Sequence, residues 1–367
     1  MEENIKYWIA LNLVLAENLK AAHKITKRFP NLLGAFNASR KELVALGVEE
    51  EIANALTSQE ILDQASREIE RLRRKKIRII TLEDKDYPSF LREIFDPPCV
   101  LYCAGEVAAL KEPAVSIVGA RQPTPYGRAV AERLALDLAS RGIVVVSGLA
   151  RGIDSIGHWG ALKGGKTVAV LGSGLENIYP KENMKLFERI IEDGAVISEF
   201  PLESPPLGFH FPLRNRIISG LSHALIVVEA AKKSGSLISA RLALEQNREV
   251  MAVPGKITSS LSKGTNWLIK NGAKLVEGWE DVAEDLSSPL REQLLSQKGE
   301  QIENSPSMNH QEEKIFGLLR PDSEIHIDEL VEKSEFSISE MLSILLKLEI
   351  KGLISQRPGK YFQRKWQ

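Results

Sequence analysis

The sequence predicts an α/β protein with a mostly parallel, Rossmann-like sheet covered by helices, flanked by an N-terminal helical domain and a C-terminal winged helix. Between residues 76 and 286, short apolar segments rich in β-branched residues alternate with helical segments. Strands of a parallel sheet are buried on both faces, and their sequences are therefore continuously apolar. On either side of this region the apolar residues recur mainly at helical spacing.

Length and composition exclude several classes of protein. A chain of 367 residues is too long for one ordinary core and indicates two or three domains. Lys and Arg number 48 against 49 Asp and Glu, so any nucleic-acid binding must come from a local basic surface. Cys99 and Cys103 are spaced CxxxC without a Cys/His cluster, so no metal site is expected, and so few cysteines suit a reducing cytoplasm. The apolar run at the N-terminus predicts an amphipathic helix rather than a signal peptide, and no segment approaches the roughly 20 apolar residues of a membrane span.

Residues 1–75 are predicted to form short helices similar to a SAM or helix-hairpin-helix module. Their apolar residues recur at helical spacing and are interrupted by Pro30, Gly34 and Gly47. Helical hairpins can bind phosphate through backbone N–H groups and nearby basic side chains. The usual hairpin has two closely spaced glycines, whereas Gly47 stands alone. A packing module is therefore favoured over a DNA clamp, and both remain open.

Seven strands are expected in the central domain, residues 76–286. They cover residues 77–82, 114–119, 143–148, 167–172, 195–200, 223–230 and 249–255. Helical segments such as 126–141 and 183–193 separate several of them. This alternation is typical of a parallel sheet with helices on both faces.

The C-terminal region is predicted to be a linker followed by a winged helix-turn-helix. Residues 287–310 are polar and typical of a linker, and residues 311–367 contain three amphipathic stretches followed by a hairpin-like segment. The presumed recognition helix, 337–353, offers few donors for base edges, so sequence-specific reading of DNA is not expected. The wing has several basic residues around two aromatic ones: Arg357, Lys360, Arg364 and Lys365, with Tyr361 and Phe362. A protein contact and a wing-led phosphate contact both remain open.

Two apparent phosphate-binding motifs are not expected to function. Residues 160–167 match the P-loop pattern, but a helical segment precedes them and a strand follows, which reverses the order that places a helix N-terminus at the phosphates. Gly172 and Gly174 begin like a dinucleotide fingerprint, but Asn177 occupies the third glycine position. No nucleophile stands beside a convincing base, so no catalytic residue, no cofactor and no enzymatic activity are predicted.

The candidate binding site consists of the loops that follow successive strands, because open α/β sheets bind ligands at the carboxyl ends of their strands. These loops combine glycine or serine with cations, so that backbone N–H groups and basic side chains could contact phosphates. The candidate residues are Gly119 and Arg121; Ser147, Gly148, Arg151, Gly152 and Asp154; Arg214, Asn215 and Arg216; Ser234, Gly235 and Ser236; and Lys256. Phe211, close to the arginines, offers a flat face on which a base could stack.

A structural interpretation of the same residues stays open. The glycines could form tight turns, and Asp154 could cap the following helix. Arg214 and Arg216 could pair with Glu199 or Glu229 inside the domain, and Phe211 could belong to the core.

The stretch from about Tyr87 to Asp281 resembles the DNA-processing protein A family, also called DprA or Smf. The matching phrases include SIVGARQPTPYG, VVSGLARGID, FPLRNRIISGLS and EAAKKSGSLISARLALEQNREVMAVPG. The resemblance implies a Rossmann-like homodimer that binds single-stranded DNA, loads the RecA recombinase onto it and protects incoming DNA in natural transformation, without nucleotide hydrolysis. It places most of the residues above on the family's DNA-facing loops: Arg121, Ser147, Gly148, Arg151, Gly152, Asp154, Arg214, Asn215 and Arg216, with Phe211 at the position of a stacking aromatic. Trp159 and Gly208 depart from the family pattern, in which basic residues are found.

Two other functions remain as alternatives. A nucleotide hydrolase of the phosphoribohydrolase type would hold phosphate with a PGGxGTxxE-like loop, where this chain has KKSGSLISARLALE. A pure interaction scaffold with a vestigial groove would not bind a poly-dT oligonucleotide.

Overall fold

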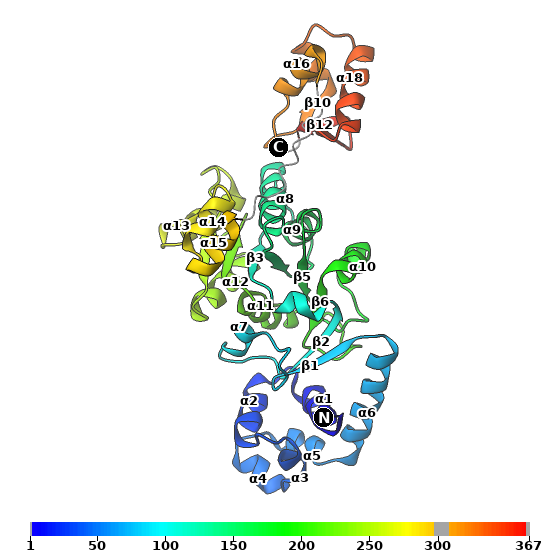
Figure 1. Ribbon diagram of the computed structural model, residues 1–367, viewed down its shortest axis with the longest axis vertical. Coiled ribbons are helices and arrows are strands. Elements are labelled where there is room, and N and C mark those ends of the chain that lie inside the picture. The colour runs from blue at the N-terminus through cyan, green and yellow to red at the C-terminus, as the bar shows by residue number, and fades with distance from the viewer. Residues whose placement is uncertain (1, 297–307, 365–367) are drawn as a thin grey trace.

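The computed structural model describes residues 2–296 and 308–364 (Figure 1). Its central feature is a nine-stranded sheet with the order β1-β2-β6-β5-β4-β3-β7-β8-β9. The strands are β1 Arg78–Thr81, β2 Val100–Gly105, β3 Ala114–Val118, β4 Val144–Ser147, β5 Thr167–Val170, β6 Ala195–Ser198, β7 Ala224–Val227, β8 Glu249–Ala252 and β9 Lys274–Leu275. From β6 to β9 every pairing is parallel, whereas β1 and β2 are antiparallel additions. The predicted mostly parallel sheet is confirmed.

All seven predicted strands are present, and two strands were not predicted. β9 has only two residues, too few for a periodic signal. β2 is apolar and almost wholly buried, but it pairs antiparallel with β6, which lies far along the chain. An antiparallel addition of this kind does not follow the βαβ alternation by which the other strands were predicted.

Helices cover both faces of the sheet. Alternate residues of a strand point to opposite faces, so Val144 and Val146 belong to one core and Val145 to another. The first core is covered mainly by α7, α11, α12 and α13, and the second by α8, α9 and α14. Their bounds are α7 Ser89–Arg92, α8 Pro125–Ala139, α9 Ile153–Ala161, α10 Met184–Asp193, α11 His210–Gly220, α12 Gly235–Glu245, α13 Lys263–Lys270 and α14 Trp279–Asp285, with short 3-10 helices at Val107–Leu110, Lys181–Asn183 and Ser260–Ser262.

The strand order reverses between β3 and β7. β4, β5 and β6 follow β3 on one side, and the chain then returns to place β7 and β8 on the other. The loops after β3 and β7 consequently lead away from each other and leave a crevice at the carboxyl ends of these strands.

The N-terminal helices share a core with the central domain. They are α1 Glu2–Leu15, α2 Leu19–Arg28, α3 Leu33–Asn37, α4 Arg40–Ala45, α5 Glu50–Leu56 and α6 Gln59–Arg74. Their apolar side chains join those of β2, β5 and β6 in one buried cluster. Gly47 turns the chain between α4 and α5 with a φ of 76°, and the N–H groups of Gly47 and Val48 donate to Val44 and Leu43 carbonyls. Because these N–H groups have partners within the turn, the structure supports the packing interpretation of this module.

The segment predicted as a linker begins with a helix instead. Residues Ser288–Ser296 form α15, which packs against α14 and buries Leu294 completely. Leu290 and Leu294 are one helical turn apart and both join the core, a pair concealed by the polar composition around them. The remainder of the predicted linker from 297 to 307 lies outside the described residues.

The predicted winged helix is confirmed. It comprises α16 His310–Leu318, β10 Ile325–His326, α17 Ile327–Glu332, α18 Ile338–Ile350, β11 Ile354–Arg357 and β12 Tyr361–Arg364. The three strands form a small sheet in the order β10-β12-β11, and the helices and sheet enclose their own core. Across the described ranges, no helix combines the length and apolar character needed to cross a membrane.

His158 lies on α9, one of the helices that cover the parallel sheet, and is completely buried. Its Nδ1 lies 2.7 Å from the Thr167 hydroxyl, which donates its own hydrogen to Val145 O. Nδ1 must therefore be the donor to Thr167, and the ring is neutral. Burial first, and the charge of Arg214 second, lower the pKa of His158 to about 3.

This histidine is expected to weaken the fold in acid. Since the folded pKa lies below the unfolded value of about 6.5, only the unfolded chain takes up the proton as the pH falls from 6.5 towards 3, and stability is lost in that window. Between pH 7 and pH 5 the free energy of unfolding should fall by about 2 kcal/mol more in the natural chain than in His158→Asn, which keeps a donor towards Thr167. Urea unfolding at both pH values measures the difference, and parallel pH dependence in the two proteins would contradict it.

Candidate nucleic-acid interface

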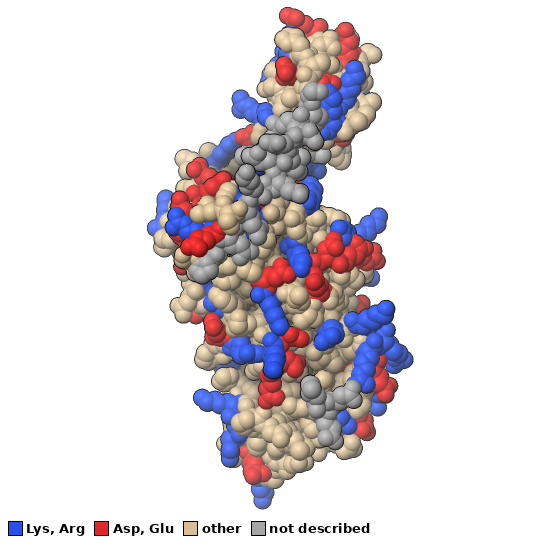
Figure 2. Space-filling model, in the orientation of Figure 1, with Lys and Arg blue, Asp and Glu red and all other residues tan. Residues whose placement is uncertain are grey.

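A groove of about 570 Å³ lies at the switch point of the sheet. Its walls come from the loops that follow β3, β4, β5, β6 and β7. Nine of the predicted site residues line it: Gly119, Arg121, Asp154, Phe211, Arg214, Asn215, Ser234, Gly235 and Ser236. The predicted convergence of several strand ends on one site is therefore present in the structure. Basic and acidic side chains are intermingled on the face of the molecule that Figure 2 shows, in agreement with a site that depends on a few local cations.

Arg214 on α11 provides a fixed positive charge at the base of the groove. Its side chain is only 5% exposed, and its guanidinium donates to Gly148 O at 2.6 Å and to Val170 O. These carbonyls lie at the carboxyl ends of β4 and β5, so the guanidinium bridges the two strand ends. Burial lowers the pKa of Arg214 to about 10, partly opposed by the negative charge of Asp154, and the group remains protonated at neutral pH.

Arg121 is the exposed cation of the groove. It follows β3, and among the described residues none forms a hydrogen bond or an ion pair with its side chain. Its loop is held by the Ile153 N–H, which donates to Ala120 O at 3.1 Å. Gly152 makes this contact possible: its φ is 79°, and a Cβ there would lie 2.3 Å from Ala120 O. The guanidinium is therefore free to contact an anion, on a loop whose path is fixed.

Three predicted residues support the structure of the groove, and two of them, Ser147 and Gly148, do not line it. Ser147 is completely buried and donates to Ile117 O at 2.6 Å. Gly148 is buried beneath Arg214, where a Cβ would lie 2.6 Å from the guanidinium. Asp154 does line the groove, but it accepts the Gly148 N–H at 3.1 Å and balances the charge of Arg214. The prediction that Ser147 and Gly148 face a ligand is therefore wrong, because both are buried.

Arg216 does not belong to the site, and its predicted ligand contact is wrong. The residue is 3% exposed, and its two terminal nitrogens donate to the two Glu199 oxygens at 2.7 and 2.6 Å. Its Nε donates to Asp96 O at 3.0 Å. Residues two apart on a helix point in directions about 200° apart, so Arg214 and Arg216 cannot both face the groove. For Arg216 the structural interpretation, an internal pair with Glu199, is the correct one.

Arg151, Gly152 and Lys256 lie outside the lining of the groove. Arg151 is exposed and forms a bidentate pair with the exposed Glu182 at 2.6 and 2.7 Å. Surface pairs of this kind are weak because water and salt screen them, so a phosphate could replace the carboxylate. Lys256 is exposed in the loop after β8. DNA contact by Arg151 and Lys256 stays a prediction.

The N-terminus of α12 forms another wall of the groove. Ser234 caps this helix, since its hydroxyl accepts the Ser236 N–H at 3.3 Å. Nothing lies within 4 Å of a Cβ built on Gly235, so the space above the first turn is open. The helix dipole makes such a terminus favourable for an anion. Of the first three N–H groups, those of Ser236 and Leu237 already donate to Ser234.

An aromatic pair lines the groove beside these cations. The rings of Phe211 and Tyr179 lie 5.8 Å apart between centroids and are tilted by 49°. Phe211 packs over Gly172, where a Cβ would lie 3.0 Å from the ring. The sequence predicted Phe211 but not Tyr179. Tyr179 lies in the loop that follows β5, and this position at the carboxyl end of a strand was the signal by which the sequence could have identified it.

The apparent P-loop has the reversed geometry that the sequence predicted. Helix α9 ends at Ala161 and β5 begins at Thr167, so residues 160–167 join a helix to a strand. Lys166 forms ion pairs with Glu106 at 3.0 Å and with Glu112 at 2.8 Å. Among the residues with assigned positions, no three His, Cys, Asp or Glu side chains are grouped as metal ligands.

The wing has fewer available cations than its sequence suggests. Arg364 stacks on Phe316, with its Cζ 4.0 Å from the ring centroid. The Nε of Arg357 lies 3.7 Å from the Oε1 of Glu324. Lys360 is exposed at the turn, and Lys365 lies outside the described residues. Among the described wing residues, a phosphate contact would therefore depend mainly on Lys360.

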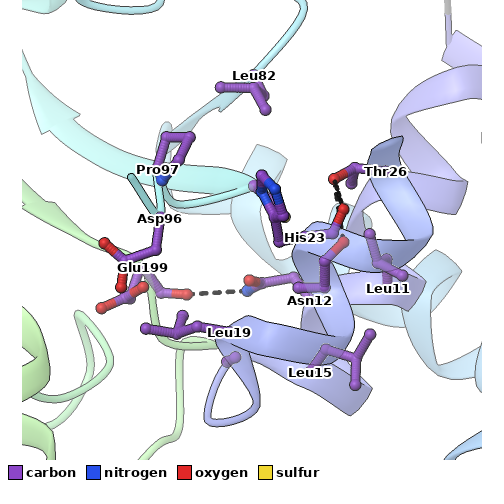
Figure 3. A pocket seen from close by; sticks show the side chains of 13 residues that line it. Leu11, Asn12, Leu15, Leu19, His23, Thr26, Leu82, Asp96, Pro97 and Glu199 are labelled. Carbon is purple, nitrogen blue, oxygen red and sulfur yellow. Dashed lines mark hydrogen bonds between the residues drawn. The ribbon is translucent and has the colours of Figure 1, made fainter. Parts of the chain in front are cut away.

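The N-terminal helices contact the element that carries the groove residues. Asn12 donates to Glu199 O at 2.9 Å, as Figure 3 shows, and Glu17 pairs with His210 at 2.8 Å. His210 begins α11 and immediately precedes Phe211. The pocket at this junction has a volume of about 30 Å³, enough for a water molecule but not for a nucleotide. These contacts indicate that the N-terminal module fixes the position of α11.

Known proteins share the sequence and the overall structure of this chain. The family model described as DNA recombination-mediator protein A matches residues 78–287, and the model of the DprA winged helix domain matches residues 303–360. Protein Smf of Escherichia coli (strain K12) is 41% identical over 287 residues, which cover 77% of this chain and 76% of that protein. The X-ray structure of DNA processing protein A from Streptococcus pneumoniae has a TM-score of 0.69 at 34% identity, covering 77% of this chain and 98% of that one. A structure of DNA processing protein A from Helicobacter pylori that concerns its single-stranded DNA binding mode has a TM-score of 0.52 at 35% identity, covering 56% and 94%.

Proposed function

This chain belongs to the DNA recombination-mediator protein A family, and from that premise we propose that it is a non-enzymatic mediator that binds single-stranded DNA. In this proposal it protects incoming strands in the cytoplasm and helps to load RecA onto them during natural transformation, without hydrolysing nucleotides. The observation that carries the proposal is the groove at the switch point, where an exposed arginine, a buried arginine and a helix N-terminus surround an aromatic pair.

In this proposal some residues of the groove contact phosphates and others contact bases. Arg121 and the first turn of α12 would hold phosphates, and the fixed charge of Arg214 would raise the local concentration of the polyanion. Phe211 and Tyr179 would stack on bases, whose faces are available only when the strand is unpaired. Neither kind of contact reads base edges, so binding would not depend on sequence.

We propose that two copies associate through the β9 edge of the sheet. Large apolar side chains are exposed on the elements along this side: Leu244 on α12, Ile257 after β8, Trp267 on α13 and Leu275 on β9. Where exposed apolar side chains form a continuous surface, that surface marks a protein contact. An isologous dimer would place two grooves on one particle and allow it to bridge two parts of a strand.

Fluorescence anisotropy with a labelled poly-dT oligonucleotide tests the proposal, with double-stranded DNA as the control. Tight binding to the single strand is expected, and log affinity should fall with log salt concentration by roughly 0.7 for each neutralised phosphate. Binding that does not respond to salt, or equal affinity for both DNA forms, would contradict the proposed groove.

Phe211→Ala is expected to weaken binding of poly-dT by about 1–3 kcal/mol, the typical loss of one base–aromatic stack. Phe211→Leu is the matched control, because leucine keeps apolar contact with Gly172 but has no flat face. Both variants should therefore lose affinity, whereas only Phe211→Ala should also lose stability in urea. Unchanged affinity in Phe211→Leu would show that this ring packs against the protein and not against DNA.

A further inference from the structure

A row of four exposed aliphatic side chains runs along α18 of the winged helix. Ile338, Leu342, Leu346 and Ile350 are 57%, 43%, 57% and 77% exposed. They are spaced by four residues, which places them on a single ridge of the helix surface. The opposite side of α18 already supplies the core with Met341, Ile344, Leu345 and Leu348. The exposed row is therefore not needed for folding of this domain.

The row does not suit nucleic acid. In a winged helix that reads DNA, the corresponding helix presents donors and cations to the groove. Here the exposed face presents aliphatic side chains together with Ser339 and Ser343, and Lys347 is its single cation. An apolar face bordered by polar residues is typical of a contact between proteins.

We propose that α18 pairs in an antiparallel manner with α18 of a second copy of this chain. The order of residue types along the row, Ile-Leu-Leu-Ile, is the same from either end, and the centre of the row is at residue 344. Reversal about that centre places Ile338 at the level of Ile350 and Leu342 at the level of Leu346. A two-fold axis requires this kind of self-complementarity, because each copy offers the same patch.

Side-chain size and charge also agree with the antiparallel pair. Among the residues at the centre of the exposed face, Leu346 would lie within one residue of the level of Ser343 of the second copy. Ile350 would lie within one residue of the level of its Ser339, so large side chains have small ones beside them. Glu340 and Lys347 border the row on the same side, and reversal brings each within about one residue of the other's level. A parallel pair would instead place like charges together.

The contact is an addition to the proposed DNA groove and the proposed dimer of the central domain. One pair of short helices buries less than the roughly 800 Å² per partner of a stable interface, so it should be weak alone. Copies already held near one another would gain from it through their high effective concentration. The terminal domain would then connect neighbouring protein molecules.

Cysteine cross-linking in the full chain tests the pairing directly. In Ser343→Cys the two thiols lie one residue from the two-fold axis, about 3 Å apart along the helices, and should form an intermolecular disulfide under mild oxidation. Ser339→Cys is the matched control: this exposed serine lies on the same face, but its two copies would be about 15 Å apart along the helices. The unsubstituted chain gives the background from Cys99 and Cys103.

Preferential cross-linking of Ser343→Cys supports the antiparallel pair. Equal cross-linking of the two variants would overturn it in favour of a parallel pair or random collision. Cross-linking of neither above background would also overturn it, since the row would then be covered by another partner or by another part of the same chain. Adding Arg121→Ala to the Ser343→Cys variant should leave its cross-linking unchanged, because Arg121 lies in the groove and not on α18. A failure of DNA binding can therefore be distinguished from a failure of the pairing.

Sedimentation provides a second measurement. Leu346→Glu should lower the weight-average mass that the natural chain reaches at high concentration. Leu295→Glu on α15 is the control, since Leu295 is 58% exposed against 57% for Leu346. Identical masses for both variants, whether lowered or unchanged, would contradict the proposal.

Discussion

Arg216→Met is expected to destabilise the fold by about 3–5 kcal/mol, because removing one partner of a buried ion pair leaves the other charge without compensation. Glu199 is 2% exposed and accepts both terminal nitrogens of Arg216. Burial raises the pKa of Glu199, and the charge of Arg216 opposes that rise. Without the guanidinium, the carboxylate must either stay charged in a buried site or take up a proton.

Two further variants separate this explanation from a loss of packing. The Asp96 carboxylate also lies 3.4 Å from the Arg216 Nε, but its side chain is 32% exposed. In the double variant Arg216→Met/Glu199→Leu both charges of the buried pair are absent and only the partly solvated Asp96 loses its partner, so most of the lost stability should return. Arg151→Met removes an arginine from a bidentate pair of similar length with Glu182, but that pair is exposed. Water and salt screen such a pair, so this variant should lose far less stability than Arg216→Met. Urea unfolding measures all three. A double variant as unstable as Arg216→Met would mean that the methylene stem, and not the buried charge, matters at this position.

Arg121→Ala is expected to weaken binding of poly-dT by about 1.5–3 kcal/mol, the usual contribution of a hydrogen bond to a charged group. The salt dependence should also become less steep, by roughly 0.7 in the log–log slope, because one phosphate is no longer neutralised. Stability should not change, since none of the described residues forms a hydrogen bond or an ion pair with the Arg121 side chain.

A control of equal charge makes this prediction specific to the groove. Arg189→Ala on α10 removes one exposed positive charge that is paired with Glu192 and Asp193, and it should leave both affinity and slope almost unchanged. Arg121→Lys should recover the slope but only part of the affinity, because lysine binds phosphate as a point charge without the bidentate geometry. Equal losses in Arg121→Ala and Arg189→Ala would indicate a general charge effect and no contact at Arg121.

The local part of the architecture could be predicted from the sequence. Apolar β-branched runs are strands because only a doubly covered sheet buries them, and their alternation with helices makes the sheet parallel. Once the sheet is parallel, the loops after its strands must share one edge, and Arg121, Phe211 and Arg214 were found there as expected. The order of helix and strand likewise sufficed to reject the P-loop match at residues 160–167.

The direction in which each side chain points was decided by tertiary structure. Arg214 and Arg216 have the same chemistry and are two positions apart, but α11 turns one towards the groove and the other towards Glu199. Tyr179 joins Phe211 only because the loops after β5 and β6 meet, and β2 is a strand only because β6 accepts it at the edge of the parallel sheet. Such choices depend on partners that are distant in the sequence, whereas periodicity reports only what neighbouring residues have in common.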